Sequence, residues 1–258
     1  MNSINPATPH PAPSSPRRNC LCIDLDRIGY QDAWTLQTEL VAARWEKRLG
    51  TDVVLLLEHP PVFTLGRRGG RENLTVSEEM LTDRGIPVIQ AERGGDITFH
   101  GPGQLVMYPI MDLTSVRVGV VEYVEMLEEV VIRVAENWGI TAGRNPLNRG
   151  VWIGNSKLAS IGIAVRHGIS FHGVALNVNL SLDPFSWINP CGLKGIGITS
   201  MEKELGRSLS MEDVRHNLKH HLEEIFGIKL IMTKIEDLEI RWPFKAADAF
   251  LKRERQSV

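Results

Sequence analysis

Hydrophobic residues recur at helical spacing in three stretches of the sequence, residues 31–49, 118–138 and 210–226. The apolar stripes include Trp45 in the first stretch and Val121 in the second, and a glycine follows each of these two stretches. In the third, Ser210 and Asp213 resemble a helix-capping pair. We expect the histidines of that helix at the surface; they are His216, His220 and His221.

Shorter apolar runs between these helices predict β-strands. In chain order they are residues 20–25, 52–58, 62–65, 87–91, 104–110, 151–154, 157–165, 169–178 and 229–233. The runs from 151 to 178 are separated by short turns and predict a three-strand meander. Lys157 alternates with Ala159 and Ile161 along the middle strand, so its side chain can point inward, although an exposed turn lysine is the common alternative.

Glycines in two segments favour close contact between backbone and a ligand or another chain segment. Gly162 and Gly173 fall inside predicted strands, where glycine weakens a sheet unless something must approach closely. Residues 93–108 read Arg-Gly-Gly-Asp-Ile-Thr-Phe-His-Gly-Pro-Gly-Gln-Leu-Val-Met-Tyr, between the strands predicted at 87–91 and 104–110. This stretch is therefore a candidate binding loop, and a plain polar hairpin loop is the alternative.

The thiol of Cys191 is the candidate nucleophile, because it lies between a proline and a glycine-rich run. Successive backbone N–H groups in such a turn can stabilise an anion, lower the pKa of a thiol and form an oxyanion hole for acyl transfer. A lone cysteine is also commonly a small buried hydrophobic residue. The residues alone leave both readings open.

Composition indicates one globular domain. Hydrophobic residues make up 43% of 258, enough for a sizeable core. The charges nearly balance, with 29 basic and 31 acidic residues, and the basic residues form no long run in the sequence. This pattern argues against nucleic acid or an anionic membrane as a partner. The three cysteines form no disulfide framework and no apolar run approaches the roughly 20 residues of a membrane span, so we expect a cytoplasmic protein.

The two ends of the chain differ from its middle. Residues 1–19 are rich in proline, have no acidic residue and lack the apolar region of a secretory signal, so we expect a disordered tail. Cys20 and Cys22, two apart in a predicted strand, are expected to pack on one face of it. We expect residues 20–227 to form the domain and residues 228–258 an extension of unknown role.

Five segments of the sequence resemble the lipoyl(octanoyl) transferase family, also called lipoate-protein ligase B. Residues 93–108 match the family pattern at every position. The resemblance extends over about residues 20–227, through His59-Pro60 with Thr64 and Gly66 and through the segments at 157–162, 170–177 and 189–192. Ordered motifs of this kind seldom coincide by chance.

The resemblance implies an α/β (α+β) fold similar to the biotin and lipoate ligase catalytic domain, with a mixed, mostly antiparallel sheet flanked by helices. It implies transfer of an octanoyl group from octanoyl-acyl carrier protein to a lysine of lipoyl domains in 2-oxoacid dehydrogenase complexes or of the glycine cleavage H protein. A thioester donor is already activated, so no cofactor and no metal are expected.

The same resemblance assigns the site residues. Cys191 would hold the acyl thioester, and Lys157 would favour the thiolate and transfer protons. The octanoyl chain needs an apolar slot walled by backbone, which would explain the glycines inside the strands. The residues that match substrate-binding segments are Arg93, Gly94, Gly95, Asp96, Ile97, Thr98, Phe99, His100, Ser160, Ile161, Gly162, Gly173, Val174 and Ala175.

Some questions stay open at this point. Either neutral Lys157 or His100 could accept the proton of the acceptor lysine. Arg67, Arg68 and Arg71 lie on a glycine loop, and we expect them to contact the acidic carrier. Three other functions are alternatives. An ATP-dependent lipoate or biotin ligase would not need Cys191, a cysteine acyl hydrolase would release free octanoate, and a non-enzymatic binding module would catalyse no reaction.

Overall fold

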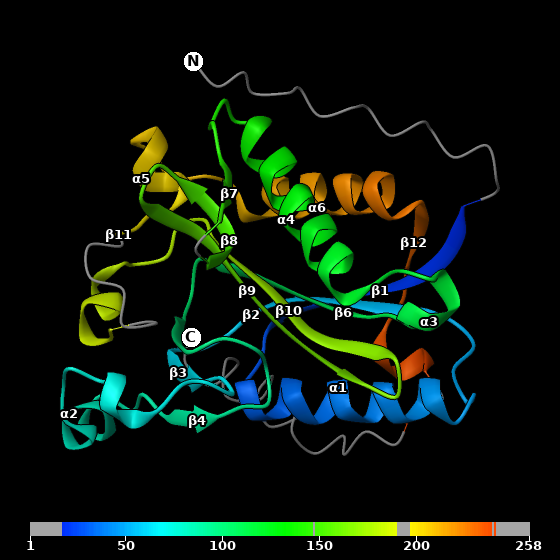
Figure 1. Cartoon of the computed structure of the whole chain (residues 1–258), viewed down its shortest axis with the longest axis horizontal. Helices are drawn as coiled ribbons and strands as arrows, with labels where there is room; N and C mark the ends of the chain where they lie inside the picture. Colours follow the sequence, from blue (N-terminus) through cyan, green and yellow to red (C-terminus); the bar gives the residue numbers. More distant parts are fainter. Residues whose placement is uncertain (1–16, 147, 190–196, 239, 241–258) are drawn as a thin grey trace, which may run out of the picture.

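The computed structural model describes residues 17–146, 148–189, 197–238 and 240, which are built around a nine-stranded mixed sheet (Figure 1). In spatial order the strands are β12 (Ile228–Met232), β1 (Arg18–Arg27), β2 (Asp52–Glu58), β6 (Gln104–Ile110), β10 (Ile169–Asn177), β9 (Ser156–Arg166), β8 (Asn148–Ile153) and β7 (Gly143–Asn145), with β11 (Gly197–Ile198) beside β9. The pairs β12–β1, β1–β2 and β11–β9 are parallel, and the other neighbours are antiparallel.

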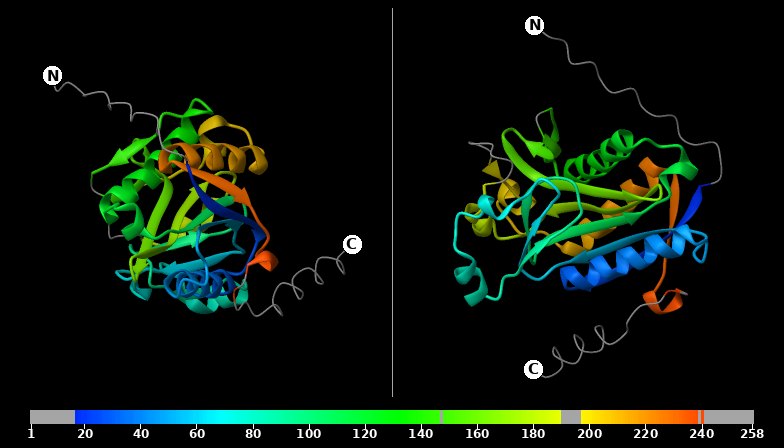
Figure 2. Two further views of the ribbon diagram at one scale, coloured as in Figure 1. Left: turned by 90° about the vertical axis from the view of Figure 1, so that its right-hand side faces the viewer. Right: turned by 60° about the horizontal axis from the view of Figure 1, so that its bottom comes forward.

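Helices cover both faces of this sheet, which explains its nearly continuous hydrophobic strands. Helix α1 (Tyr30–Trp45) lies on one face, and α4 (Val120–Glu136) and α6 (Met211–Phe226) lie on the other, as the end-on view in Figure 2 also shows. One core cluster forms between the sheet and α4 and α6, and a second forms between the sheet and α1. No helix among the described residues combines the length and hydrophobicity needed to cross a bilayer.

A smaller three-stranded sheet lies at one end of the main sheet (Figure 1). Its order is β4 (Val88–Gln90), β3 (Val62–Leu65) and β5 (Ile97–His100). Phe63 of β3 and Phe99 of β5 pack with Phe185 in a third core cluster. The remaining short elements are η1 (Arg71–Asn73), α2 (Glu78–Asp83), α3 (Leu113–Val116), η2 (Asp183–Trp187), α5 (Met201–Leu205) and η4 (Ile235–Asp237).

The predicted fold class is confirmed, and so is the meander. Strands β8, β9 and β10 pair in succession, and their turns contain Gly154, His167 and Gly168 at positive φ. Ser210 caps α6, because its hydroxyl oxygen accepts a hydrogen bond from the backbone N–H of Asp213 at 3.2 Å. The meander and the cap follow from local turn and cap chemistry, which a sequence displays directly.

Cys20 and Cys22 are both fully buried in the core, which confirms that they pack on one face of β1. Strand β12 continues the main sheet beyond residue 227, since residues 228–232 pair in parallel with residues 18–22 of β1. The chain therefore contributes its last described strand to the same sheet as its first.

Several predictions about individual elements were wrong. The first helix ends at Trp45 rather than at residue 49, and the side chain of Trp45 is exposed and stacks on His167. Val121 is also exposed. The exposed fraction falls from 60% at Val121 to 0% at Leu127, so the first turn of α4 extends beyond the sheet that the rest of the helix covers. Residues 97–100 form β5, whereas the sequence indicated only a loop between two strands.

Candidate active site

The guanidinium of Arg93 fixes the loop that opens the central motif. Arg93 is buried, and it donates from Nε and Nη2 to Thr64 Oγ1 at 3.1 and 2.8 Å and from Nη2 to the Thr64 carbonyl at 2.6 Å. Its Nη1 donates to the carbonyl of Gly94 at 3.0 Å. Burial lowers the pKa of Arg93. These bonds to neutral oxygens tie the loop to β3 of the small sheet.

The loop is also fixed to the main sheet. The N–H of Gly94 donates to the carbonyl of Ile163 on β9 at 2.9 Å. A side chain at Gly162 would lie 2.7 Å from the Gly94 carbonyl, and one at Gly173 would collide with the Met107 carbonyl of β6. Close approach of neighbouring backbone therefore accounts for both glycines, and an acyl chain is not needed to explain them.

His100 belongs to a buried hydrogen-bond chain. Its Nδ1 donates to Gln104 Oε1 at 2.7 Å, and its Nε2 lies 3.3 Å from Thr64 Oγ1. Gln104 Nε2 in turn donates to Asn177 Oδ1 at 2.8 Å. Burial lowers the pKa of His100 well below its ordinary value, and the charges of neighbouring groups such as Arg93 lower it further. The imidazole is therefore neutral, with both nitrogens already engaged.

His59 is the second buried histidine of this region. Its Nδ1 donates to the carbonyl of Ile28 at 2.7 Å, which leaves Nε2 to accept from Tyr108 Oη at 2.8 Å. Burial lowers the pKa of His59 to about 4, against the opposing effect of its bond to Ile28. The fixed neutral tautomer makes His59 a structural support for the tyrosine that faces the cleft.

A cleft between the loop, β5, β8, β9 and β10 collects nearly all of the candidate residues. It is lined by Lys157 and, from the expected substrate-binding set, by Arg93, Gly94, Gly95, Asp96, Ile97, Thr98, His100, Ser160, Ile161, Gly162, Gly173, Val174 and Ala175. Phe99 of that set packs in the third core cluster instead, on the face of β5 opposite to Thr98 and His100. The cleft thus has apolar strand walls and ionisable side chains at Arg93, Asp96, Arg149 and Lys157.

Several residues that line the cleft are missing from the expected substrate-binding set. Tyr30, Tyr108, Trp152 and His172 also face the cleft. Tyr108 and His172 lie within the motifs at 93–108 and 170–177, and Trp152 could also have been indicated, because a tight turn links its strand to the strand that contains Lys157. Tyr30 comes from the first turn of α1, and no local pattern links it to residues far away in the chain.

Lys157 is placed at the start of β9, directly opposite Trp152 of β8. Its Nζ lies 4.7 Å from the centroid of the Trp152 ring. Ile198 of β11 pairs with Lys157 on the other side of β9, and the N–H of Thr199 donates to the Lys157 carbonyl at 3.0 Å. Cys191 lies outside the described residues, which resume at Gly197 in β11.

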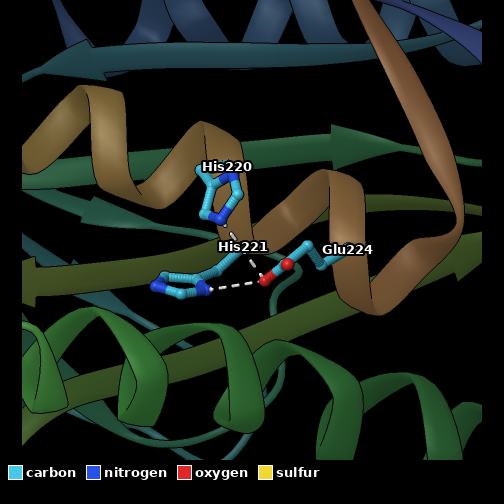
Figure 3. Close-up of side chains that lie close together, drawn as sticks. All are labelled: His220, His221 and Glu224. Carbon is cyan, nitrogen blue, oxygen red and sulfur yellow. Dashed lines mark hydrogen bonds and ion pairs between the residues drawn. The ribbon is translucent and has the colours of Figure 1, made fainter. Parts of the chain in front are cut away.

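The described residues also include a cluster of groups that could ligate a metal, His220, His221 and Glu224 of α6 (Figure 3). The nitrogens of His220 and His221 lie 3.5 and 3.2 Å from one carboxylate oxygen of Glu224. None of the three lines the cleft. His221 is buried rather than at the surface as expected, whereas His216 and His220 are exposed.

Comparison with known proteins identifies relatives over most of the chain. Residues 29–223 match the family described as Lipoyl protein ligase A/B catalytic domain. An octanoyltransferase of Desulfotalea psychrophila is 49% identical over 207 residues, which cover 80% of this chain and 93% of that protein. An octanoyltransferase of Caldicellulosiruptor saccharolyticus is 44% identical over 227 residues, which cover 87% of this chain and 96% of that protein.

Solved structures of low sequence identity share the fold. A bi-partite lipoate protein ligase from Thermoplasma acidophilum superimposes with a TM-score of 0.63 at 17% identity, covering 93% of each chain. Lipoate-protein ligase A bound with ATP gives a TM-score of 0.63 at 15% identity, covering 93% of this chain and 95% of that one. The chain therefore belongs to the family of Lipoyl protein ligase A/B catalytic domains, with octanoyltransferases as its relatives at more than 40% identity.

Proposed function

We propose that the protein transfers an octanoyl group from octanoyl-acyl carrier protein to a lysine of lipoyl domains, through a thioester on Cys191. The main support is the pairing of β11 with β9, because it brings the chain that follows the Cys191 segment beside Lys157. The apolar walls at Ile161 and Val174 suit an alkyl chain. The buried thiols of Cys20 and Cys22 suit a reducing compartment such as the cytoplasm.

The first half-reaction forms the acyl-enzyme. The Cys191 thiolate, stabilised by the Lys157 ammonium, attacks the thioester carbonyl of the donor. The carbon–sulfur bond to the carrier then breaks, and the departing thiolate takes a proton from Lys157. The products are the octanoyl thioester on Cys191, the free thiol of the carrier and neutral Lys157.

The second half-reaction moves the acyl group to nitrogen. Neutral Lys157 takes a proton from the acceptor ammonium, and the resulting amine attacks the thioester carbonyl. The carbon–sulfur bond to Cys191 breaks, the thiolate is restored beside the Lys157 ammonium, and the second amine proton passes to solvent. We assign the base to Lys157 rather than His100, because both nitrogens of His100 are engaged in hydrogen bonds and burial lowers its pKa.

Intact-mass spectrometry tests this mechanism. The protein is mixed with octanoyl-acyl carrier protein, beside Cys191→Ser, Lys157→Ala and, as a control, Lys229→Ala at an exposed position. We expect a hydroxylamine-labile octanoyl adduct in the parent and the control, lost when a lipoyl domain is added. Acceptor modification that requires ATP and leaves no adduct would instead make the protein a ligase.

We further propose that acidic donor and acceptor proteins dock beside the cleft, at Arg67 and Arg68. Both residues are exposed, and Arg68 lines an open groove with Arg144 and Arg149 next to the cleft. Arg71 does not line this groove, and it pairs with Glu78. The same positive charge would first bind the acyl carrier protein and then the acceptor, which is the glycine cleavage H protein or a lipoyl domain of a 2-oxoacid dehydrogenase complex.

Charge reversal tests the docking surface. Arg68→Glu should raise KM for octanoyl-acyl carrier protein several-fold and weaken the salt dependence of kcat/KM, because long-range attraction is removed. Lys229→Glu, an exposed reversal on β12, is the matched control. An unchanged KM and salt dependence in Arg68→Glu would remove this residue from the docking surface.

A further inference from the structure

Trp152 and Lys157 form a contact that the reaction scheme above does not use. The two residues are partners across the β8–β9 hairpin, and the Lys157 Nζ lies 4.7 Å from the centre of the indole. This distance is within the roughly 6 Å at which a cation is attracted to an aromatic face. Trp152 is only 3% exposed, and Lys157 is partly exposed at the cleft, so water screens the attraction only in part.

The indole is held in place by its own strand. Its Nε1 donates to the carbonyl of Asn148 at 3.2 Å. The register of β8 and β9 shifts between Val151 and Trp152, and such a bulge redirects the side chain that follows it. The ring is therefore oriented before Lys157 meets it.

A buried carboxylate of α4 fixes the backbone next to this contact. Glu128 is 1% exposed and accepts a hydrogen bond from the Gly150 N–H at 2.9 Å, while Arg144 and Arg149 lie within ion-pair distance of its other oxygen. Gly150 has a φ of +128°, and a side chain there would lie 3.3 Å from the Lys157 Cε. The lysine stem thus lies against a backbone position that requires glycine.

We propose that Trp152 is a positioning residue that holds the ammonium of Lys157 in place and in its charged form. The proposal rests on the proposed role of Lys157 in acyl transfer. The attraction acts on the ammonium and not on the free amine, so its loss lowers the pKa of Lys157 and misplaces the proton donor. Loss of a merely space-filling tryptophan would not lower the pKa of Lys157.

Pre-steady-state acylation of Cys191, measured against pH, tests the proposal. Trp152→Leu should slow acylation about tenfold and move its alkaline limb to lower pH by up to about one unit. Trp152→Phe should retain much of both properties, because phenylalanine keeps an aromatic face. Trp45→Leu, which changes an exposed tryptophan outside the cleft, should match the parent.

Progressively fluorinated tryptophan at position 152 keeps the shape of the ring while weakening its negative face, so it tests the proposal even if Trp152→Leu folds poorly. We expect the acylation rate, and the pKa of the alkaline limb of its pH profile, to fall as the number of fluorine atoms increases. Equal rates across the fluorinated series, or equal losses in Leu and Phe with an unmoved alkaline limb, would overturn the proposal. A fully active Lys157→Ala would instead overturn the proposed role of the lysine itself.

Discussion

Three buried histidines beside the cleft should make the folded protein sensitive to mild acid. His59, His100 and His172 have exposed fractions of 0%, 4% and 1%. Burial lowers the pKa of His59 to about 4 and that of His172 to about 3, where the charge of Arg93 adds to the effect. Burial also lowers the pKa of His100 well below its ordinary value. The native state therefore keeps all three neutral.

The sign of the effect follows from proton binding. Above about pH 6.5 the histidines are neutral in both states and contribute no pH dependence. Below it the unfolded chain binds protons that the native state excludes, so stability falls as pH falls towards the native pKa values. At pH 5.5 each histidine should cost about 1.4 kcal/mol, or about 4 kcal/mol for the three together. This is a large part of a typical unfolding free energy of about 5–15 kcal/mol.

Carboxylates should not obscure this window. The pKa values of Asp112 and Glu129 are lowered from 3.8 and 4.5, although burial itself opposes the hydrogen bonds and charges that lower them. Their contribution to stability is therefore lost only at lower pH. Between pH 7.5 and 5.5 the histidines should dominate.

Urea unfolding at pH 7.5 and 5.5 measures the difference. His172→Asn should reduce it by about 1.4 kcal/mol, and asparagine suits the positive φ of this residue, +56°. The variant His216→Gln, at an exposed position, should show the parent's full difference. A parent whose unfolding free energy changes by less than about 1 kcal/mol between the two pH values would refute the reasoning.

Three further predictions concern single residues. Gly173→Ala should cost about 1–3 kcal/mol in urea unfolding, because its methyl would meet a carbonyl of β6, whereas Gly143→Ala, with nothing within 4 Å, should not. Asp112→Ala should lower the unfolding free energy by about 1 kcal/mol in the same assay, because the carboxylate caps α3. Asp112→Asn should keep most of the parent's stability, because asparagine is also a good helix cap. Cys20 and Cys22 should resist iodoacetamide at pH 8 in mass spectrometry, since burial raises their pKa, to about 12 for Cys22; rapid labelling of either would contradict this.

Strands of both sheets could be predicted because their hydrophobic patterns are local features of the sequence. Residues 52–58, 62–65 and 104–110 are apolar runs whose predicted and observed limits coincide. The meander was predictable for a similar reason, since turns with glycine at positive φ separate runs of strand residues. These signals need no knowledge of what packs against them.

The cleft needed more than local signals. Tyr30 and His172 are about 140 positions apart, yet both face it, because α1 covers the sheet where β10 passes. The motif residues were found through the pattern of 93–108, but that pattern did not separate Phe99, which packs in a core, from His100, which lines the cleft. Which face of β5 is buried depends on β3, β4 and η2 and not on β5 alone.

The strand glycines show how a correct position can have a different physical cause. Gly162 lies in the cleft wall as expected, but its missing side chain admits the Gly94 carbonyl of the Arg93 loop. That loop is in turn held to β3 by Arg93 and Thr64. The wall is therefore made where the Arg93 loop meets β9 backbone to backbone, and its position is set before any acyl chain enters. Enlarging Gly162 should displace the loop and weaken the fold together with binding, whereas a slot shaped only for a ligand would lose binding alone.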